Sequence, residues 1–402
     1  MSRTLLLLAV TDVLPFGGLA LTSDVKVIYQ GWAQVLQTGT FPLDDMTWQY
    51  PPLAALVMVA PGWLPCSYFT GFLVLVVVCD ALAGALLLRA ARRGGSGAGG
   101  SGAGGSGAGV WLWVAGVPLL GPTVYCRFDL VVSAVAMAGL LAAARRPVLG
   151  GVLAGLGAML KVWPLLTVLG LPRGPRTRDA WLAVAGSALA VGFVCAVTMN
   201  GAFSFLRFQA DRGVEVESLG ALPFEAAHLF GWPGTAAMNY GSVELLGPGV
   251  ALVGHAMVAL SLGGFGWLLL WRARSRRWSA ATPADAALAA LLLFVVTSRV
   301  ISPQYLVWLI GLAAVCLTHR RTTQRPVAWL LLAAGAMTFL EFPLLFGQVM
   351  NFGLFGSLAL VLRNLLLLAA ALLSCRRLWR GSVAAEPAVS AGPRADRLAT
   401  AR

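Results

Sequence analysis

The chain has 402 residues, of which 58% are hydrophobic and 11% are charged. Its mean hydropathy of +0.81 is too high for a soluble domain and predicts an all-α, polytopic membrane protein. The net charge of +13 does not indicate nucleic acid as a partner, because the arginines form short clusters between apolar runs instead of one basic face.

Six arginine clusters divide the chain, and the positive-inside rule places each of them in the cytoplasm. An even number of crossings must then separate consecutive clusters, which together with a cytoplasmic Arg3 predicts about twelve transmembrane or half-membrane helices. These helices form one integral membrane domain over 1–380, and the tail 381–402 is expected to be disordered in the cytoplasm. The clusters are Arg89, Arg92 and Arg93; Arg145 and Arg146; Arg173, Arg176 and Arg178; Arg272, Arg274, Arg276 and Arg277; Arg320, Arg321 and Arg325; and Arg376, Arg377 and Arg380.

The first apolar run, 5–21, is expected to be a retained membrane anchor, because no small-residue cleavage site follows it. Asp24 comes where this run leaves the membrane, so its carboxylate avoids the charge penalty of the bilayer and lies at the level of lipid head groups. That position suits a catalytic base for membrane-lipid chemistry. The simpler interpretation is an interfacial aspartate that caps a helix.

Residues 23–67 are expected to form an extracytoplasmic loop with two interfacial helices. Apolar residues recur at helical spacing over 25–36, and the apolar stretch 53–64 is too short to span a bilayer. Asp44 and Asp45 between them are interpreted as a solvated turn, with a divalent-cation site as the alternative.

The glycine- and serine-rich repeat 94–109 predicts a flexible cytoplasmic linker. It is not a phosphate-binding loop, because it lacks the G-K-[ST] ending and no strand precedes it. Two helices follow, and the outer turn between them, 124–129, places Arg127 and Asp129 on the same side of the membrane as Asp24.

The apolar run 147–171 lies between two basic clusters, so a single crossing would place the second cluster outside. Two short helices that meet near Lys161 and Pro164 resolve this conflict, because proline breaks a helix and a charged lysine is poorly suited to lipid. Lys161 is therefore expected at a break that is reached from outside. Four glycines in this run predict close helix packing: Gly150, Gly151, Gly155 and Gly157.

A second extracytoplasmic loop, 200–244, carries Arg212 and Glu217. This charged segment is either a solvated face or a site where Arg212 binds an anionic head group and an acid orients it. Arg299 lies at another helix mouth, where a side chain that reaches the interface is the simpler interpretation. The other helices are expected over 179–199, 245–271, 281–298, 303–318, 327–345 and 353–374.

Arg363 and Glu341 both lie deep in apolar runs, where an unpaired charge costs several kcal/mol, so we expect them to form a structural ion pair, with substrate contact as the alternative. The six cysteines predict no disulfide framework, with a pair between Cys66 and Cys126 as the alternative. Neither the cysteines nor the three histidines have metal-ligand spacing, and no metal or cofactor is predicted.

Several short motifs occur in order along the chain, and most of them fall in the expected outer segments. They are Asp24 to Tyr29, Gly39 and Pro42, Tyr50-Pro51-Pro52-Leu53, Arg127-Phe128-Asp129, Lys161-Val162-Trp163-Pro164, Arg212-Gly213 with Glu217-Ser218, and Ser302-Pro303-Gln304-Tyr305. Together they resemble glycosyltransferase family 87, whose members are GT-C membrane enzymes that use polyprenyl-phosphate sugars. Lipomannan-type and phosphatidylinositol-mannoside-type members carry a histidine where this chain has Gln304 and Tyr305.

The resemblance implies a GT-C-like fold and an inverting transfer of a hexose, with mannose as the first candidate. The donor would be a polyprenyl-phosphate sugar and the acceptor a lipid or glycolipid, on the extracytoplasmic face of the plasma membrane. Asp24 would deprotonate the acceptor hydroxyl, and cations would stabilise the phosphate that leaves. The candidate substrate-binding residues are Lys26, Tyr50, Arg127, Asp129, Lys161, Arg212, Glu217, Arg299, Gln304 and Tyr305.

A transporter or flippase is the main alternative, since Lys161, Glu341 and Arg363 could line a pathway through the membrane. Transporters usually contain internal repeats with paired broken helices, and none of the motifs has a second copy. A membrane-bound acyltransferase is a third alternative, but no histidine is placed beside an acid within an apolar run.

Overall fold

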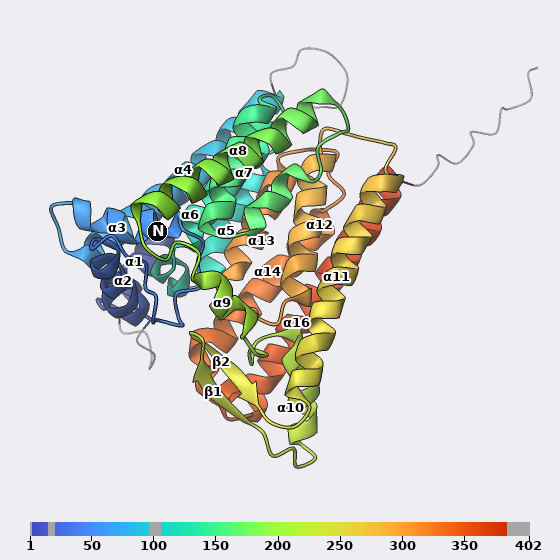
Figure 1. The fold of residues 1–402 in the computed structure, drawn as a ribbon. Coiled ribbons are helices and arrows are strands. Elements are labelled where there is room, and N and C mark those ends of the chain that lie inside the picture. Colours follow the sequence, from blue (N-terminus) through green and yellow to red (C-terminus); the bar gives the residue numbers. More distant parts are fainter. Residues whose placement is uncertain (1, 15–20, 96–105, 384–402) are drawn as a thin grey trace, which may run out of the picture.

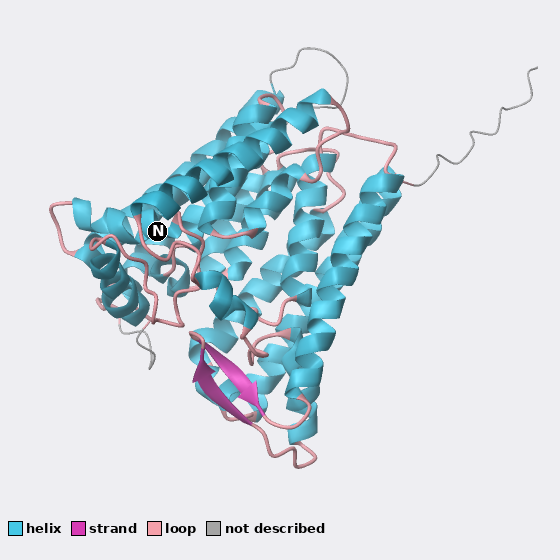
Figure 2. Cartoon of the chain, in the orientation of Figure 1, coloured by secondary structure: helices cyan, strands magenta, loops and turns pink. Residues whose placement is uncertain are grey.

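The computed structural model describes residues 2–14, 21–95 and 106–383, which form a bundle of helices with one two-stranded hairpin (Figures 1 and 2). Residues 15–20 of the first apolar run, 96–105 of the predicted linker and 384–402 of the predicted tail lie outside the described residues. The prediction of a helical protein is confirmed, and the hairpin is the exception to the all-α class.

The first half of the chain contains, in order, α1 (Ser2–Val10), the π-helix η1 (Asp24–Tyr29), α2 (Gln30–Leu36), α3 (Ala54–Val59), the 3₁₀ helix η2 (Ala60–Trp63), α4 (Tyr68–Gly95), α5 (Ala108–Leu119), the 3₁₀ helix η3 (Pro122–Cys126), α6 (Asp129–Ala143), α7 (Pro147–Leu160), the 3₁₀ helix η4 (Trp163–Val168) and α8 (Pro175–Thr198). The second half contains α9 (Phe205–Ala210), the 3₁₀ helix η5 (Leu219–Ala221), α10 (Leu222–His228), β1 (Thr235–Asn239), β2 (Ser242–Leu246), α11 (Val250–Arg274), α12 (Thr282–Thr297), α13 (Tyr305–Leu317), α14 (Arg325–Phe339), the π-helix η6 (Leu340–Leu344), α15 (Phe346–Met350) and α16 (Leu354–Ser382).

In the described part of the chain, five helices are long and apolar enough to cross a membrane, namely α4, α8, α11, α14 with η6, and α16. Shorter apolar helices include α5, α6, α7, α12 and α13. This is the helix content of a multi-pass membrane protein, whereas the predicted count of about twelve transmembrane or half-membrane helices is not confirmed.

The hydrophobic core surrounds α12 and α13. Every residue of α13 after Tyr305 is buried, and so are most residues of α12. Both helices are apolar on all sides, which explains why they lie inside the bundle instead of on its surface.

All six arginine clusters lie at one end of the bundle, which we call the basic end (upper side of Figure 1). The first three clusters share one cavity. Three hydrogen bonds join further clusters: Arg173 to the carbonyl of Arg272 (2.8 Å), the Arg276 N–H to the carbonyl of Ser382 (3.0 Å), and Arg377 to the carbonyl of Thr323 (3.2 Å). The chain therefore returns to the same end between clusters, as the even-crossing rule requires.

The predicted helix break at Lys161 is confirmed. The chain leaves the basic end as α7 and returns through η4, and Lys161 between them has an extended backbone (φ −151°, ψ 141°). Pro164 near the start of η4 prevents α7 from continuing.

The glycines of α7 allow three helices to pack closely, as predicted. A Cβ atom on Gly150 would lie 2.6 Å from Cα of Ala143 in α6, and one on Gly155 would lie 2.6 Å from the carbonyl oxygen of Val184 in α8. These distances are too short for any larger residue, so the small residues set the spacing of the helices.

The first apolar run is not one continuous helix among the described residues. The helix α1 ends at Val10, and Asp12 has a positive φ of 60°. Nε of Arg3 lies 3.1 Å from Oδ2 of Asp80, a buried residue near the middle of α4. The prediction that Arg3 lies with the basic clusters is therefore wrong, because a buried carboxylate within an apolar helix requires a cation or donors.

Several boundaries also differ from the prediction. The helix expected over 68–88 extends to Gly95 and thus includes the first two residues of the predicted linker. The last helix continues to Ser382, beyond the expected start of the tail.

The second outer loop contains the hairpin of β1 and β2, which the sequence analysis missed. The strands are antiparallel, and Asn239 pairs with Ser242 across a two-residue turn. Tyr240 and Gly241 both have positive φ in this turn, the geometry that two-residue hairpins favour.

Candidate active site

Asp24, the first residue of η1, forms an ion pair with Arg127. Its Oδ2 lies 2.8 Å from Nη2 of Arg127, and 31% of the Asp24 side chain is exposed, against 15% for Arg127. The start of η1 has no side-chain capping hydrogen bond, so this geometry does not support the helix-cap interpretation. The arginine orients the carboxylate and leaves part of it open to a ligand.

Lys161 forms a second ion pair, which is buried. Its Nζ lies 2.7 Å from Oδ1 of Asp129, and Nε1 of Trp308 donates to the same oxygen at 2.8 Å. If either charge were removed, the other would be buried without a partner, which is unfavourable. The ion pair therefore holds both side chains in place.

Four aromatic rings surround the Lys161 ammonium, and we call them the aromatic cage. The distances from Nζ to the ring centroids are 4.8 Å for Phe128, 4.9 Å for Trp308, 5.3 Å for Tyr50 and 5.6 Å for Tyr305. These contacts stabilise the cation and exclude water from it. With less water to screen it, the lysine charge acts more strongly on a nearby anion.

Arg212 is held by the hairpin. Its Nη2 donates to the Ser242 hydroxyl at 2.8 Å, while its Nε is buried and has no hydrogen-bond partner among the described residues. Backbone hydrogen bonds from Val216 to Val243 (2.9 Å) and from Leu245 to Val214 (2.8 Å) fix the segment that follows it. Arg212 therefore has a defined position, and its buried Nε has a hydrogen-bonding capacity that the described residues leave unused.

These pieces converge at the end of the bundle opposite the basic end. Arg127 and Arg212 both lie within electrostatic range of Lys161, and Tyr50 lies within range of Asp24. We call Asp24, Arg127, Lys161 and Arg212 the polar cluster. Such a set provides one carboxylate that can accept a proton and three cations that can stabilise an anion.

A comparison with known protein families identifies the chain. The model described as Glycosyltransferase family 87 matches residues 48–303, which is more than half of the chain. The chain belongs to glycosyltransferase family 87. No curated protein and no solved structure matches it. The matched residues include Arg127, Lys161 and Arg212, whereas Asp24 precedes them.

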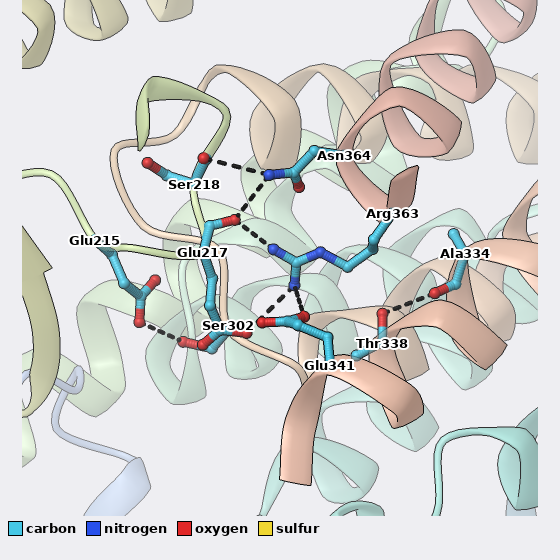
Figure 3. A network of polar contacts seen from close by, with 9 residues as sticks. All are labelled: Glu215, Glu217, Ser218, Ser302, Ala334, Thr338, Glu341, Arg363 and Asn364. Atoms are coloured by element: carbon cyan, nitrogen blue, oxygen red, sulfur yellow. Dashed lines mark hydrogen bonds and ion pairs between the residues drawn. The ribbon is translucent and has the colours of Figure 1, made fainter. Parts of the chain in front are cut away.

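Next to the polar cluster, this family 87 glycosyltransferase contains a buried ionic network around Arg363 (Figure 3). Nη1 of Arg363 lies 3.1 Å from Oε2 of Glu341 and 3.3 Å from Oε1 of Glu217, and Nη2 donates to the Glu217 carbonyl. Asn364 donates to the carbonyl oxygens of Glu217 (3.2 Å) and Ser218 (3.3 Å). The predicted Arg363–Glu341 ion pair is confirmed.

Glu217 takes part in this network and is buried, so its position is that of a structural residue. Its place in the charged segment that contains Arg212 predicted a substrate-binding residue. In the structure its carboxylate lies against Arg363, and we therefore leave it out of the proposed substrate site.

Glu215 connects the ionic network to the polar cluster. It is buried, and it accepts a hydrogen bond from the Ser302 hydroxyl at 3.4 Å (Figure 3). Burial raises the pKa of Glu215 from 4.5 to about 7, although the charges of Arg212 and Arg363 act in the opposite direction. A carboxyl group that titrates near neutral pH thus lies within electrostatic range of Arg212.

Three other predicted residues lie at the edge of the candidate site or away from it. Lys26 is exposed, with Nζ 3.7 Å from Asp12 and 4.6 Å from the centroid of the Phe69 ring. Arg299 accepts a backbone hydrogen bond from Glu215 at 3.0 Å, which fixes the 215 segment. Gln304 is the half-buried residue that precedes α13.

Trp308 is the site residue that the sequence analysis missed. It lies three positions after Tyr305, so one turn of helix places both rings on the same face, and their centroids are 3.9 Å apart. Helical spacing from the predicted helix start at 303 was the available signal.

Asp45 has a structural role instead of a metal-binding one. It accepts hydrogen bonds from Nε1 of Trp32 (2.7 Å) and from the backbone N–H of Thr47 (2.9 Å), as expected for a turn. In the described part of the chain, no three His, Cys, Asp or Glu side chains are grouped as a metal site. All six cysteines are free thiols, including Cys66 and Cys126.

Proposed function

We propose that this glycosyltransferase transfers a hexose, with mannose as the first candidate, from a polyprenyl-phosphate donor to a lipid or glycolipid acceptor. The observation that carries the proposal is the polar cluster, in which the Asp24–Arg127 ion pair lies beside two further cations. A phosphate-linked donor requires cations around the leaving phosphate and a base for the acceptor, and the cluster supplies both kinds of group.

In the proposed reaction, Asp24 accepts the proton of the acceptor hydroxyl. The acceptor oxygen then attacks the anomeric carbon from the side opposite the phosphate, and a new glycosidic C–O bond forms. The C–O bond to the phosphate breaks, and its electron pair leaves with the polyprenyl phosphate. This single displacement inverts the anomeric configuration.

The three cations of the polar cluster have two different roles in the proposed reaction. Lys161 and Arg212 bind the donor phosphate, and Arg127 orients Asp24. The aromatic cage keeps water away from Lys161, which strengthens its attraction for the phosphate. The rings of Tyr50 and Tyr305 offer surfaces on which a sugar can pack.

The distribution of charge supports an extracytoplasmic site in the plasma membrane. The basic end carries all six arginine clusters, and arginine-rich ends face the cytoplasm in membrane proteins. The polar cluster lies at the opposite end and would then meet lipid-linked substrates of the outer leaflet.

The test is a transfer assay with the purified protein in lipid vesicles. Polyprenyl-phosphate mannose, polyprenyl-phosphate glucose and a nucleotide sugar are compared as donors, with membrane glycolipids as acceptors. We expect transfer from a polyprenyl-phosphate sugar only, with inverted configuration in the product. Transfer from the nucleotide sugar alone would contradict the donor class.

The same assay separates the transporter alternative. Vesicles loaded with the lipid-linked sugar on one side report its movement across the membrane. Movement without transfer to any acceptor would contradict the proposed function and favour a flippase.

A further inference from the structure

The basic end contains a cavity that no residue of the polar cluster lines. This cavity of about 990 Å³ opens between α4, α6, α7 and α8, and we call it the basic-end cavity. Its cationic lining consists of Arg89, Arg93, Arg145, Arg146 and Arg176, and His319 also lines it.

No carboxylate is among the residues that line this cavity in the described part of the chain. Arg89, Arg145 and Arg146 all lie within electrostatic range of Arg93. In the described ranges, no acidic side chain forms an ion pair with Arg89, Arg145, Arg146 or Arg176. Several like charges that face one space repel one another, and an anion in that space would remove the repulsion.

The remaining walls of the cavity are apolar. Leucines from four segments contribute to them, namely Leu86, Leu141, Leu153 and Leu171. A cavity with arginines beside leucines is suited to an amphiphile whose phosphate binds arginine and whose chains pack on the leucines.

The simpler interpretation is that these arginines serve only to orient the helices in the membrane. That role requires no particular geometry. Arg274 and Arg276 satisfy it as exposed side chains that do not line the cavity. Five arginines of the first three clusters instead line one open cavity from three parts of the chain.

We propose that the basic-end cavity binds a phosphate group, supplied either by the head group of an anionic phospholipid or by free inorganic phosphate. Arg145 and Arg146 lie on the turn between α6 and α7, and Arg176 lies in the first turn of α8. A phosphate bound among them and Arg89 connects α4, α6, α7 and α8 at this end of the bundle.

The test measures ligand binding to the full-length protein in detergent. Dioctanoyl phosphatidylglycerol, dioctanoyl phosphatidylcholine and inorganic phosphate are titrated separately, with bound ligands counted by native mass spectrometry and thermal unfolding followed in parallel. The variant Arg145→Ala/Arg146→Ala removes two charges from the cavity. The control Arg274→Ala/Arg276→Ala removes two charges from the same end but outside it.

We expect the cavity variant to lose affinity by about tenfold or more, because a charge-assisted hydrogen bond contributes roughly that factor. The control should bind as the wild type does. Arg176→Gln is a milder variant that should also weaken binding, and it should fold normally because a cation at a helix N-terminus is not stabilising.

The three ligands identify the source of the phosphate. Binding of phosphatidylglycerol with little binding of inorganic phosphate assigns the cavity to a lipid head group, and comparable binding of inorganic phosphate assigns it to the free ion. Equal losses in the cavity and control variants would overturn the proposal, since they indicate a general surface attraction. Absence of binding by all three ligands would also overturn it.

Discussion

At the scale of single residues, the candidate site depends on pairs of opposite charge that differ in burial. The Asp24–Arg127 pair is partly exposed, whereas the Lys161–Asp129 pair is buried within the aromatic cage. A partly exposed carboxylate can reach a substrate, and a buried pair can only position its neighbours or stabilise a charge beside it. The two aspartates therefore have different functions in this account.

Lys161→Met should destabilise the protein by about 3–5 kcal/mol, because it leaves the Asp129 carboxylate buried and without its cation. The double variant Lys161→Met/Asp129→Asn should recover much of that loss but should not recover transfer activity. Thermal unfolding and turnover are measured for each single variant and for the double variant. Recovery of activity in the double variant would contradict the assignment of Lys161 to the donor phosphate.

Glu215 predicts a pH dependence of donor binding. Its pKa is raised from 4.5 to about 7 by burial, so the group is neutral below pH 6 and ionised above pH 8. Ionised Glu215 competes with the donor phosphate for Arg212, and the charged groups of the adjoining network that face it are Glu217, Glu341 and Arg363.

We therefore expect the donor KM to rise by about fivefold between pH 6 and pH 8, which corresponds to ~1 kcal/mol of screened attraction. Glu215→Gln should give a low KM with no such rise. The free energy of unfolding should also fall as pH rises. A carboxyl with a raised pKa favours the folded state at low pH, and this contribution is lost as pH rises through about 7. An unchanged pH profile in Glu215→Gln would contradict this assignment.

At the scale of secondary-structure elements, close packing at glycine holds the short helices together. The helix α7 ends at Leu160, directly before Lys161, so the contact between α7 and α8 also fixes the position of the site lysine.

Gly155→Ala should destabilise the protein by about 1–3 kcal/mol, because the new methyl group would overlap the Val184 carbonyl and the Ser187 hydroxyl. Gly186→Ala is the matched control in α8, where nothing lies within 4 Å of the added Cβ. The control should be neutral or slightly stabilising, since alanine favours helix. The measurement is the thermal unfolding of both variants. Equal losses of stability in the two would contradict the role of Gly155 in helix packing.

Local sequence rules predicted some elements well and failed at others for identifiable reasons. The break at Lys161 was predictable because proline and a charged residue interrupt an apolar run within a few positions. The hairpin was not, because its turn contains Tyr240 in a conformation that few non-glycine residues adopt. The Arg3–Asp80 contact joins residues 77 positions apart, and hydropathy carries no information about such pairs.

At the scale of the whole molecule, the bundle separates two kinds of charge. One end collects the six arginine clusters, and the other collects the Asp24–Arg127 and Lys161–Asp129 ion pairs, aromatic rings and the hairpin. Order along the chain and the rule of even crossings were enough to predict this division. These two rules could not predict that Glu217 contacts Arg363, whereas Arg212, five positions earlier, contacts the hairpin. The direction of each side chain depends on tertiary packing.

The orientation in the membrane can be tested by cysteine labelling in intact cells. Cys66 precedes α4 at the end opposite the basic end, and it is the exposed cysteine among the six. A membrane-impermeant maleimide should label it without permeabilisation, and Cys66→Ser should abolish the signal. In that background, a cysteine introduced by Arg276→Cys should react only after permeabilisation, and the reverse pattern would place the site in the cytoplasm.

The most direct test of the central claim is the turnover of Asp24→Asn in the polyprenyl-phosphate transfer assay. The substitution removes the base but keeps the size of the side chain, and Asp44→Asn provides a control in the same segment. We predict that kcat falls by a factor of about 10² to 10⁴ while thermal unfolding and donor KM change little. Turnover equal to that of the wild type and of Asp44→Asn would contradict the assignment of Asp24 as the base.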